Sequence, residues 1–177
     1  MEDPEGIQPT IGTSFKAQIF DFGQKSYHVK VYDTSGEERF SSLLSMYVHG
    51  SDIVVFVYDR NNKATFINLP NRIEFVRNIM EGTQYTKVLI SNEIRNSSRQ
   101  VLEDEGMKKA KEIGAMFVEV SCVTRSGIDD LFENIVKFHL TQSHSSSPPN
   151  SLISKSSNEN NSTSNNDTER KEVCFIQ

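Results

Sequence analysis

The chain has 177 residues, of which 36% are hydrophobic and 24% are charged, and its formal net charge is −5. This length fits one domain of ordinary size with some residues to spare, and the acidic balance argues against a nucleic-acid-binding protein. The two cysteines are too few for a disulfide framework or a four-ligand zinc site. No apolar run approaches the roughly 18 residues of a transmembrane helix, and the acidic start does not resemble a secretory signal, so we expect a cytoplasmic protein.

The first 141 residues are predicted to alternate between strands and helices. Residues 14–22 and 27–32 each alternate apolar and polar side chains, and a turn at Gly23 joins them as an antiparallel hairpin of half-buried strands. Residues 52–58 form a nearly continuous apolar run, which is typical of a central strand that is buried on both faces. Two more short strands are expected at residues 87–90 and 116–120.

Three amphipathic helices are predicted at residues 64–80, 99–115 and 126–140. Strands that alternate with helices imply an α/β fold, in which helices cover both faces of a mainly parallel sheet. Because such sheets bind ligands at the carboxyl ends of their strands, the loops that follow the strands are the candidate site.

The C-terminal part of the chain has a different composition. Half of residues 142–173 are Ser or Asn, so this segment cannot bury enough apolar surface to offset the entropy of ordering it. We therefore expect a flexible, disordered tether after a domain of residues 1–141.

The last four residues, 174–177, fit the pattern of a prenylated carboxyl terminus, in which the final Gln favours a farnesyl group. Cys174 is the predicted lipidation site, and the alternative is an accidental cysteine. Phe175 departs from the pattern, because the residue at its position is usually aliphatic.

The segment after the second predicted strand suits a sensor of magnesium and phosphate. Asp33 stands at the strand end, where its carboxylate can hold the metal through water. The backbone N–H of Gly36 can meet a terminal phosphate. Upstream, Thr10 supplies a hydroxyl group for the metal.

These motifs resemble those of the small GTPases, and specifically the Rab family. Residues 10–15, 32–40 and 47–51 stand in the order of the family segments TIGVDF, WDTAGQERF and YYRGA. Residues 57–59 and 119–122 match two further segments, and the likeness extends from Gln8 to Leu140. The resemblance implies a phosphate-loop nucleotidase fold and a molecular switch in vesicle traffic that binds GTP or GDP with Mg²⁺.

The resemblance also implies roles for individual residues and partners. Those that would contact the nucleotide are Thr10, Gly36, Asn92, Ser121 and Cys122, and those that would hold the metal are Thr10 and Asp33. The aromatic residues that effectors would contact are Phe15, Tyr32 and Tyr47. The implied partners are effector proteins, exchange factors and prenyl-binding chaperones, at the cytosolic face of endomembranes or of the plasma membrane.

The phosphate-binding part of the family pattern is missing. No G-x-x-x-x-G-K-[ST] motif occurs, and only residues 1–8 precede the segment around Thr10 that the resemblance makes the first switch. The family has a strand, the phosphate loop and a helix there, so residues 27–32 and 52–58 lack the central strand expected between them. Either the gap is closed by a rearranged sheet or strand edges are left exposed. The chain is then either an incomplete version of a longer protein or a natural variant that has abandoned nucleotide binding.

The base-reading segment also departs from the family. Residues 92–95 read Asn-Glu-Ile-Arg where the family has N-K-x-D. Asn92 is kept, but Glu93 reverses the charge of the lysine. Arg95 carries only donors, which would face the N–H donors of guanine. We therefore expect impaired nucleotide binding.

The hydrolytic position is altered as well. Glu37 replaces the family glutamine that orients the attacking water, and a carboxylate repels the terminal phosphate. GTP hydrolysis is expected to be very weak or absent. Two functions remain open: a Rab-like GTP-binding switch with impaired nucleotide binding, or a lipid-anchored pseudo-GTPase that binds proteins independently of nucleotide.

Overall fold

The protein was analysed as a computed structural model, which describes residues 13–35, 41–144 and 168–176. Its sheet has six strands in the order β1-β2-β6-β3-β4-β5. The strands are β1 (Thr13–Phe22), β2 (Lys25–Thr34), β3 (Ile53–Asp59), β4 (Thr86–Glu93), β5 (Met116–Ser121) and β6 (Thr168–Ile176). β1 and β2 pair antiparallel, and every other neighbouring pair is parallel. The predicted α/β fold with a mainly parallel sheet is confirmed.

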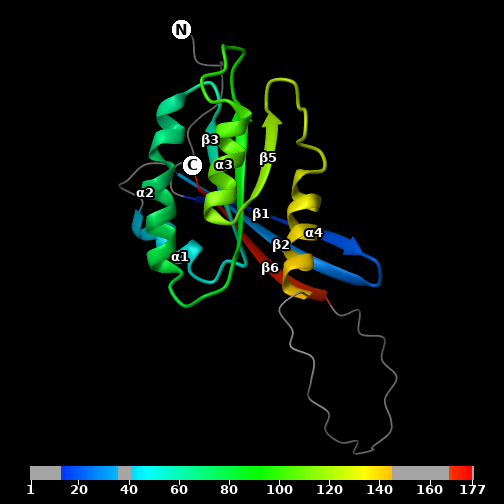
Figure 1. Cartoon of the computed structure of the whole chain (residues 1–177). Helices are drawn as coiled ribbons and strands as arrows, with labels where there is room; N and C mark the ends of the chain where they lie inside the picture. The colour runs from blue at the N-terminus through cyan, green and yellow to red at the C-terminus, as the bar shows by residue number, and fades with distance from the viewer. Residues whose placement is uncertain (1–12, 36–40, 145–167, 177) are drawn as a thin grey trace, which may run out of the picture.

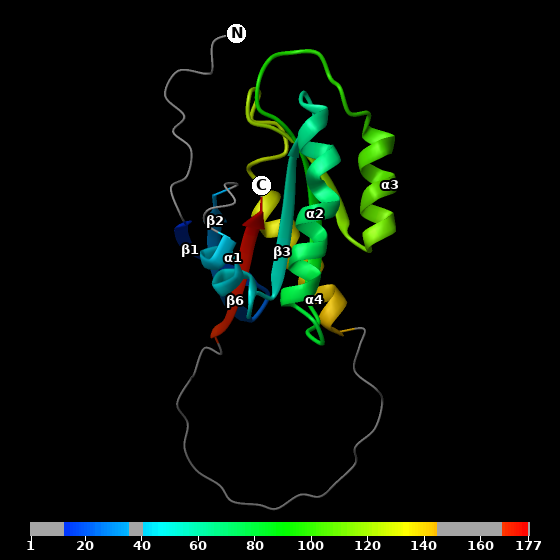
Figure 2. The ribbon, with the colours of Figure 1, turned by 90° about the vertical axis from the view of Figure 1, so that its left-hand side faces the viewer.

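Helices cover both faces of this sheet (Figures 1 and 2). They are α1 (Ser41–Val48), α2 (Lys63–Ile79), α3 (Glu103–Ile113) and α4 (Leu131–His144). Buried residues of α1, α2 and α3 form one hydrophobic cluster with the sheet, and buried residues of α4 form a second cluster. The first three helices therefore pack on one face and α4 on the other. No helix in the described part of the chain is long and apolar enough to cross a membrane.

The central strand β3 is buried on both faces, as its apolar run predicted. Val54 and Phe56 face the cluster of α1, α2 and α3, whereas Ile53 and Val55 face the cluster of α4. All four side chains are fully buried. An uninterrupted apolar run is therefore a reliable sign of a strand between two helical layers.

The prediction that β1 is half-buried was wrong. Residues 14–19 are exposed along both faces of this strand. β1 lies at the edge of the sheet and pairs only with β2, so the described helices leave most of it uncovered. The hairpin itself is confirmed, with Phe22 opposite Lys25 and Gly23 at a φ of 66° in the turn.

The predicted tether of residues 142–173 was wrong at both ends. Helix α4 continues to His144, and residues 168–173 belong to β6. Residues 145–167 lie outside the described part of the chain. Strand β6 fills the gap expected between β2 and β3, so the sheet is completed by the end of the chain rather than by its beginning.

Candidate functional site

The carboxyl ends of the parallel strands meet at one edge of the sheet. The residues at these strand ends are 33–35 at the end of β2, 59–61 at the end of β3, 92–95 at the end of β4 and 121–123 at the end of β5. β6 ends short of this edge, because its last residue, Ile176, lies opposite Phe56 of β3, whereas β3 continues to Asp59. Most of the described residues to which the family resemblance assigns a nucleotide role therefore lie at a common edge, while Thr10, Gly36 and Glu37 lie outside the described residues.

Asp33, the predicted metal residue, lies beside the C-terminal strand. It stands opposite Phe175 of β6 in the parallel register. The next residue, Thr34, is buried, and its Oγ1 donates a hydrogen bond of 2.6 Å to the carbonyl oxygen of Phe175. The surroundings of Asp33 are thus built in part by the end of this chain.

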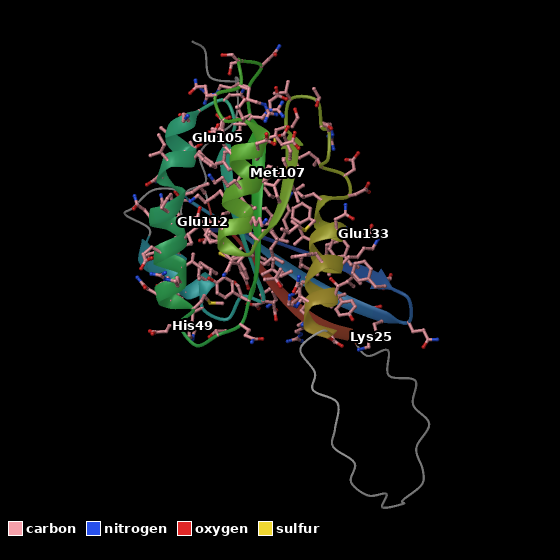
Figure 3. The ribbon with its side chains drawn as sticks, in the orientation of Figure 1. Lys25, His49, Glu105, Met107, Glu112 and Glu133 are labelled. Atoms are coloured by element: carbon pink, nitrogen blue, oxygen red, sulfur yellow. The ribbon has the colours of Figure 1, made fainter. Side chains whose placement is uncertain are left out.

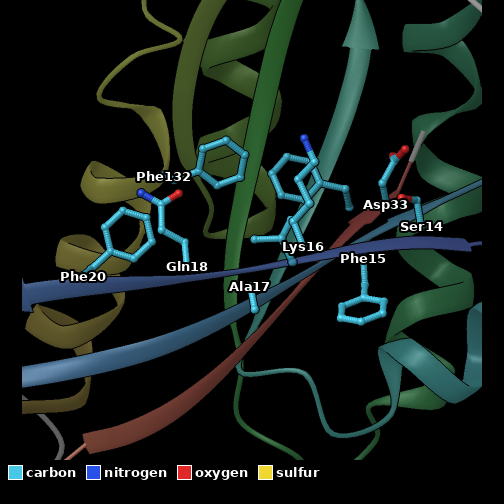
Figure 4. Close-up of a pocket in the computed structure, with 10 residues that line it drawn as sticks. Ser14, Phe15, Lys16, Ala17, Gln18, Phe20, Asp33 and Phe132 are labelled. Atoms are coloured by element: carbon cyan, nitrogen blue, oxygen red, sulfur yellow. The ribbon is translucent and has the colours of Figure 1, made fainter.

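A groove of about 520 Å³ lies next to Asp33, between β1 and α4. Its walls include Lys16 of β1, Phe132 of α4 and Phe175 of β6. Figure 4 shows Lys16 and Asp33 on one side of the strands and Phe15 on the other. The groove is mainly apolar, with Lys16 and Asp33 as its charged residues.

Glu93, which stands where the family has lysine, is held by two partners. Its Oε2 atom lies 2.6 Å from Nη2 of Arg60 and accepts a hydrogen bond of 2.6 Å from Oγ of Ser121. The hydrogen bond from Ser121 and the guanidinium of Arg60 lower the pKa of Glu93. The side chains of Arg60 and Glu93 are only 17% and 16% exposed, so this pair is largely shielded from water.

Arg60 also joins a second carboxylate. Its Nη1 donates a hydrogen bond of 2.8 Å to Oε1 of Glu119. Arg99 pairs with the same carboxylate, and Oγ of Ser91 donates to it at 3.2 Å. The hydrogen bond from Arg99 is the main cause that lowers the pKa of Glu119. We call the two arginines and two glutamates the strand-end ion network: Arg60, Glu93, Arg99 and Glu119.

The backbone at this edge is also engaged within the chain. The N–H of Cys122 donates to the carbonyl oxygen of Glu93 at 2.9 Å. The N–H of Ser121 donates to the carbonyl oxygen of Ser126 at 3.0 Å. The N–H of Arg60 donates to the carbonyl oxygen of Asn92 at 2.9 Å. Oδ1 of Asn92 is buried and has no hydrogen-bond partner among the described residues. Of the candidate base-contacting residues, Asn92 therefore keeps an unused polar atom.

The predicted aromatic trio comes together from three elements. Phe15 of β1 lies opposite Tyr32 of β2, with ring centroids 6.4 Å apart, and Tyr32 lies 4.9 Å from the ring of Tyr47 in α1. Phe15 is 68% exposed. Burial raises the pKa of Tyr32, and the charge of Glu172 on β6 adds to that effect. These three rings form an aromatic surface on the side of the sheet that carries α1.

Two features of the site had only weak signals in the sequence. Glu119 interrupts an otherwise apolar strand, a pattern that does not identify Arg60 and Arg99 as its partners. Arg60 follows β3 directly, at the edge where ligands bind. The participation of β6 had no signal beyond its four apolar residues at positions 173–176.

Comparison with known proteins finds one family model and several curated relatives that match most of the chain. The model of the Ras family matches residues 3–141. Ras-related protein RABC1 of Arabidopsis thaliana is 34% identical over 134 residues, which are 75% of this chain and 63% of that protein. Ras-related protein Rab-18-B of Danio rerio is 33% identical over 135 residues, which are 76% of this chain and 65% of that protein. The chain spans less than two thirds of the length of these relatives.

Proposed function

The chain belongs to the Ras family as a Rab-like member, and on this basis we propose that it acts in vesicle traffic as a protein-binding module with impaired nucleotide binding. The family implies GTP or GDP and Mg²⁺ as ligands. The observation that carries the proposed impairment is the strand-end ion network, which holds Glu93, the residue at the position of the family lysine that packs on the guanine base.

The network leaves little room for base recognition. Glu93 already has Arg60 and Ser121 as partners, so a ligand that drew it away would leave Arg60 without one of its two carboxylates. Separating a partly buried ion pair is costly, because the remaining charge keeps its desolvation penalty. The backbone N–H of Cys122 already donates a hydrogen bond to the backbone carbonyl oxygen of Glu93.

Arg95 adds a mismatch of hydrogen-bond type. Its side chain is exposed beyond the end of β4, and a guanidinium offers donors but no acceptor. The two N–H groups that distinguish guanine need an acceptor, which the family supplies with an aspartate. A site that leaves such groups unpaired loses affinity on the order of 10⁴-fold.

The aromatic surface supports the protein-binding part of the proposal. Exposed aromatic side chains that cluster are typical anchors of protein interfaces. Phe15 is exposed and clusters with the partly buried Tyr32 and Tyr47, at the place where the resemblance puts effectors and exchange factors. Lipid attachment at Cys174, recognition by prenyl-binding chaperones and residence at a cytosolic membrane face belong to the same proposal.

A guanine-nucleotide switch is the second candidate. The buried, unpartnered Oδ1 of Asn92 favours it, because an orphaned polar atom at a strand end is the kind of group that a ligand satisfies. Hydrolysis by such a switch would be slow, because Glu37 stands where the family has glutamine.

Titration of the full chain with a fluorescent guanine nucleotide in the presence of Mg²⁺ tests the choice. We expect no tight binding by the parent chain, and a gain in binding when Glu93→Lys and Arg95→Asp are combined. Arg77→Asp is the matched charge reversal, because Arg77 is exposed on α2 and pairs with Glu74 away from the strand ends. Submicromolar, Mg²⁺-dependent binding by the parent would favour the switch and overturn the impairment.

A further inference from the structure

The last described residues form a strand in the middle of the sheet. β6 runs parallel to β2 from Ser26↔Thr168 to Asp33↔Phe175, and parallel to β3 from Ile53↔Val173 to Phe56↔Ile176. Figure 2 shows β6 alongside β3. A strand with neighbours on both sides uses its backbone donors and acceptors in both directions, so β6 is an internal strand of the sheet.

The apolar end of β6 contributes to both hydrophobic clusters. Cys174 and Ile176 belong to the cluster that α1, α2 and α3 cover, and Val173 belongs to the cluster under α4. These three residues are at most 2% exposed. Phe175 packs on Phe132 of α4, with ring centroids 5.7 Å apart. An aromatic residue at position 175, unusual for a lipidation signal, is therefore explained by packing.

The charged end of β6 lies beside side chains of opposite charge. Glu169 pairs with Lys25 at 2.8 Å, and Figure 3 shows Lys25 beside the start of the strand. The backbone N–H of Glu172 donates to Oδ2 of Asp52 at 2.8 Å, and Nζ of Lys171 lies 3.8 Å from Oδ1 of the same carboxylate. A shift of one residue would break these contacts and turn the apolar side chains to the wrong faces.

Docking of β6 removes the thiol of Cys174 from solvent. The residue is fully buried, and burial together with the charge of Asp33 raises the pKa of the thiol to about 12. In prenylation the thiolate sulfur attacks C1 of an allylic prenyl diphosphate. The C–S bond forms, the C–O bond breaks, diphosphate leaves and the thiol proton passes to solvent. A buried thiol can make no such attack, because the thiolate is the nucleophile.

We propose that the space between β2 and β3 is a strand-binding site whose ligand is residues 168–176 of this same chain, and that docking there competes with lipid attachment at Cys174. The strand-binding part goes beyond the proposed function, whereas the competition rests on the lipid attachment proposed there. Residues 145–167 connect α4 to β6 and could span about 75 Å when extended. This length allows residues 168–176 to leave the sheet while they stay attached to the domain.

Alkylation of the full chain tests the strand-binding part, with the two cysteines compared in one sample by mass spectrometry. Cys122 is exposed and serves as the internal reference. We expect Cys122 to react at least about tenfold faster than Cys174 under native conditions, and the two rates to converge in denaturant. Equal native rates would overturn the proposal. Protection of Cys174 only in a dimer fraction would overturn the intramolecular assignment.

Two substitutions outside the last four residues test the competition. Val173→Asp places a carboxylate at a position that is 1% exposed, and should release the strand. Arg170→Asp is the matched control, because Arg170 is exposed on the same strand. With farnesyl diphosphate and a prenyltransferase, we expect Val173→Asp to be modified several-fold faster than the parent, and Arg170→Asp to match the parent.

The outcomes separate the two parts of the proposal. If Val173→Asp exposes Cys174 to alkylation but not to farnesylation, the competition and the lipid anchor fail while the strand site stands. If Val173→Asp alkylates as slowly as the parent, the strand site is contradicted. Should this variant fail to fold, the native alkylation ratio of the parent still decides the strand-binding part.

Discussion

At the scale of single residues, the charge reversal at Glu93 is accommodated by a partner from another strand. The sequence shows a glutamate where the family has lysine, and this predicted a damaged base site. It could not show that Arg60 and Ser121 hold that glutamate, because their approach depends on the pairing of β3, β4 and β5. Family motifs therefore indicate candidate site positions, and tertiary structure decides what the residues at those positions contact.

Glu93→Gln tests the network through pH. The pKa of Glu93 is lowered in the folded protein, so its ionised form stabilises the fold above the unfolded pKa of about 4.3. That contribution is lost as the pH falls through the lower folded value. We expect Glu93→Gln to destabilise the protein more at pH 7 than at about pH 3.5, as measured by urea unfolding.

Glu112→Gln is the control for this comparison. Glu112 is exposed on α3 and pairs with Lys109 outside the network. Its substitution should change the free energy of unfolding by no more than about 0.5 kcal/mol at pH 7. An effect of Glu93→Gln that is the same at both pH values would show that the ion pair contributes no pH-dependent stability.

At the scale of elements, the sequence predicted five of the six strands that the structure describes and missed β6. The apolar run of β3 and the alternation of β1 and β2 are properties of their own residues. β6 begins with a charged stretch and owes its burial to its neighbours, so composition assigned most of it to the tether. The short helix α1 was not predicted either.

Helix boundaries also depended on tertiary contacts. The helix predicted from residue 99 begins at Glu103, because the N–H groups of Gln100 and Val101 donate to the carbonyl oxygen of Arg60. Glu105 then accepts from the N–H of Leu102 at 2.9 Å and caps the helix start. The helix predicted from residue 126 begins at Leu131.

Gly106 shows how closely α3 packs on the sheet. A Cβ atom there would lie 2.3 Å from Oη of Tyr58 and 2.6 Å from Cε2 of Phe117. We expect Gly106→Ala to destabilise the protein by about 1–3 kcal/mol through overpacking. Lys108→Ala, at an exposed position of the same helix, should change stability by no more than about 0.5 kcal/mol. Denaturant unfolding compares them, and a more stable Gly106→Ala variant would mean that helix propensity outweighs the clash.

Phe175→Ala tests the packing of β6 against α4. Phe175 is partly buried against Phe132, so its truncation should lower the free energy of unfolding by about 1–3 kcal/mol. Phe15→Ala is the matched truncation, because Phe15 is 68% exposed, and a change below about 0.5 kcal/mol is expected there. Equal effects of the two variants in urea unfolding would argue that Phe175 is not part of the core.

At the scale of the whole molecule, the motifs predicted the fold class and a gap between residues 27–32 and 52–58 that none of the expected strands fills. The occupant of the gap was not, because nothing local distinguishes a C-terminal strand from a tether that ends in a few apolar residues. The sheet thus uses the end of the chain where the family resemblance led us to expect an earlier segment.

Cellular fractionation of Cys174→Ser tests the proposed anchor. A single lipid gives only marginal and reversible membrane binding, and a docked β6 would withhold part of the protein from modification. We expect the parent to divide between soluble and membrane fractions, the Cys174→Ser variant to be soluble, and Cys122→Ser to behave like the parent. A Cys174→Ser variant that sediments with membranes as the parent does would exclude the lipid as the anchor.

Amide hydrogen exchange of the full chain tests the completed sheet most directly. Exchange reports the opening free energy of each segment without any substitution. Residues 173–176 of β6 lie opposite residues 53–56 of β3, so the two segments share hydrogen bonds and should open together. We predict that their amides exchange at similarly slow rates. Exchange of residues 173–176 at the rate of an unstructured peptide, with β3 still protected, would contradict the account.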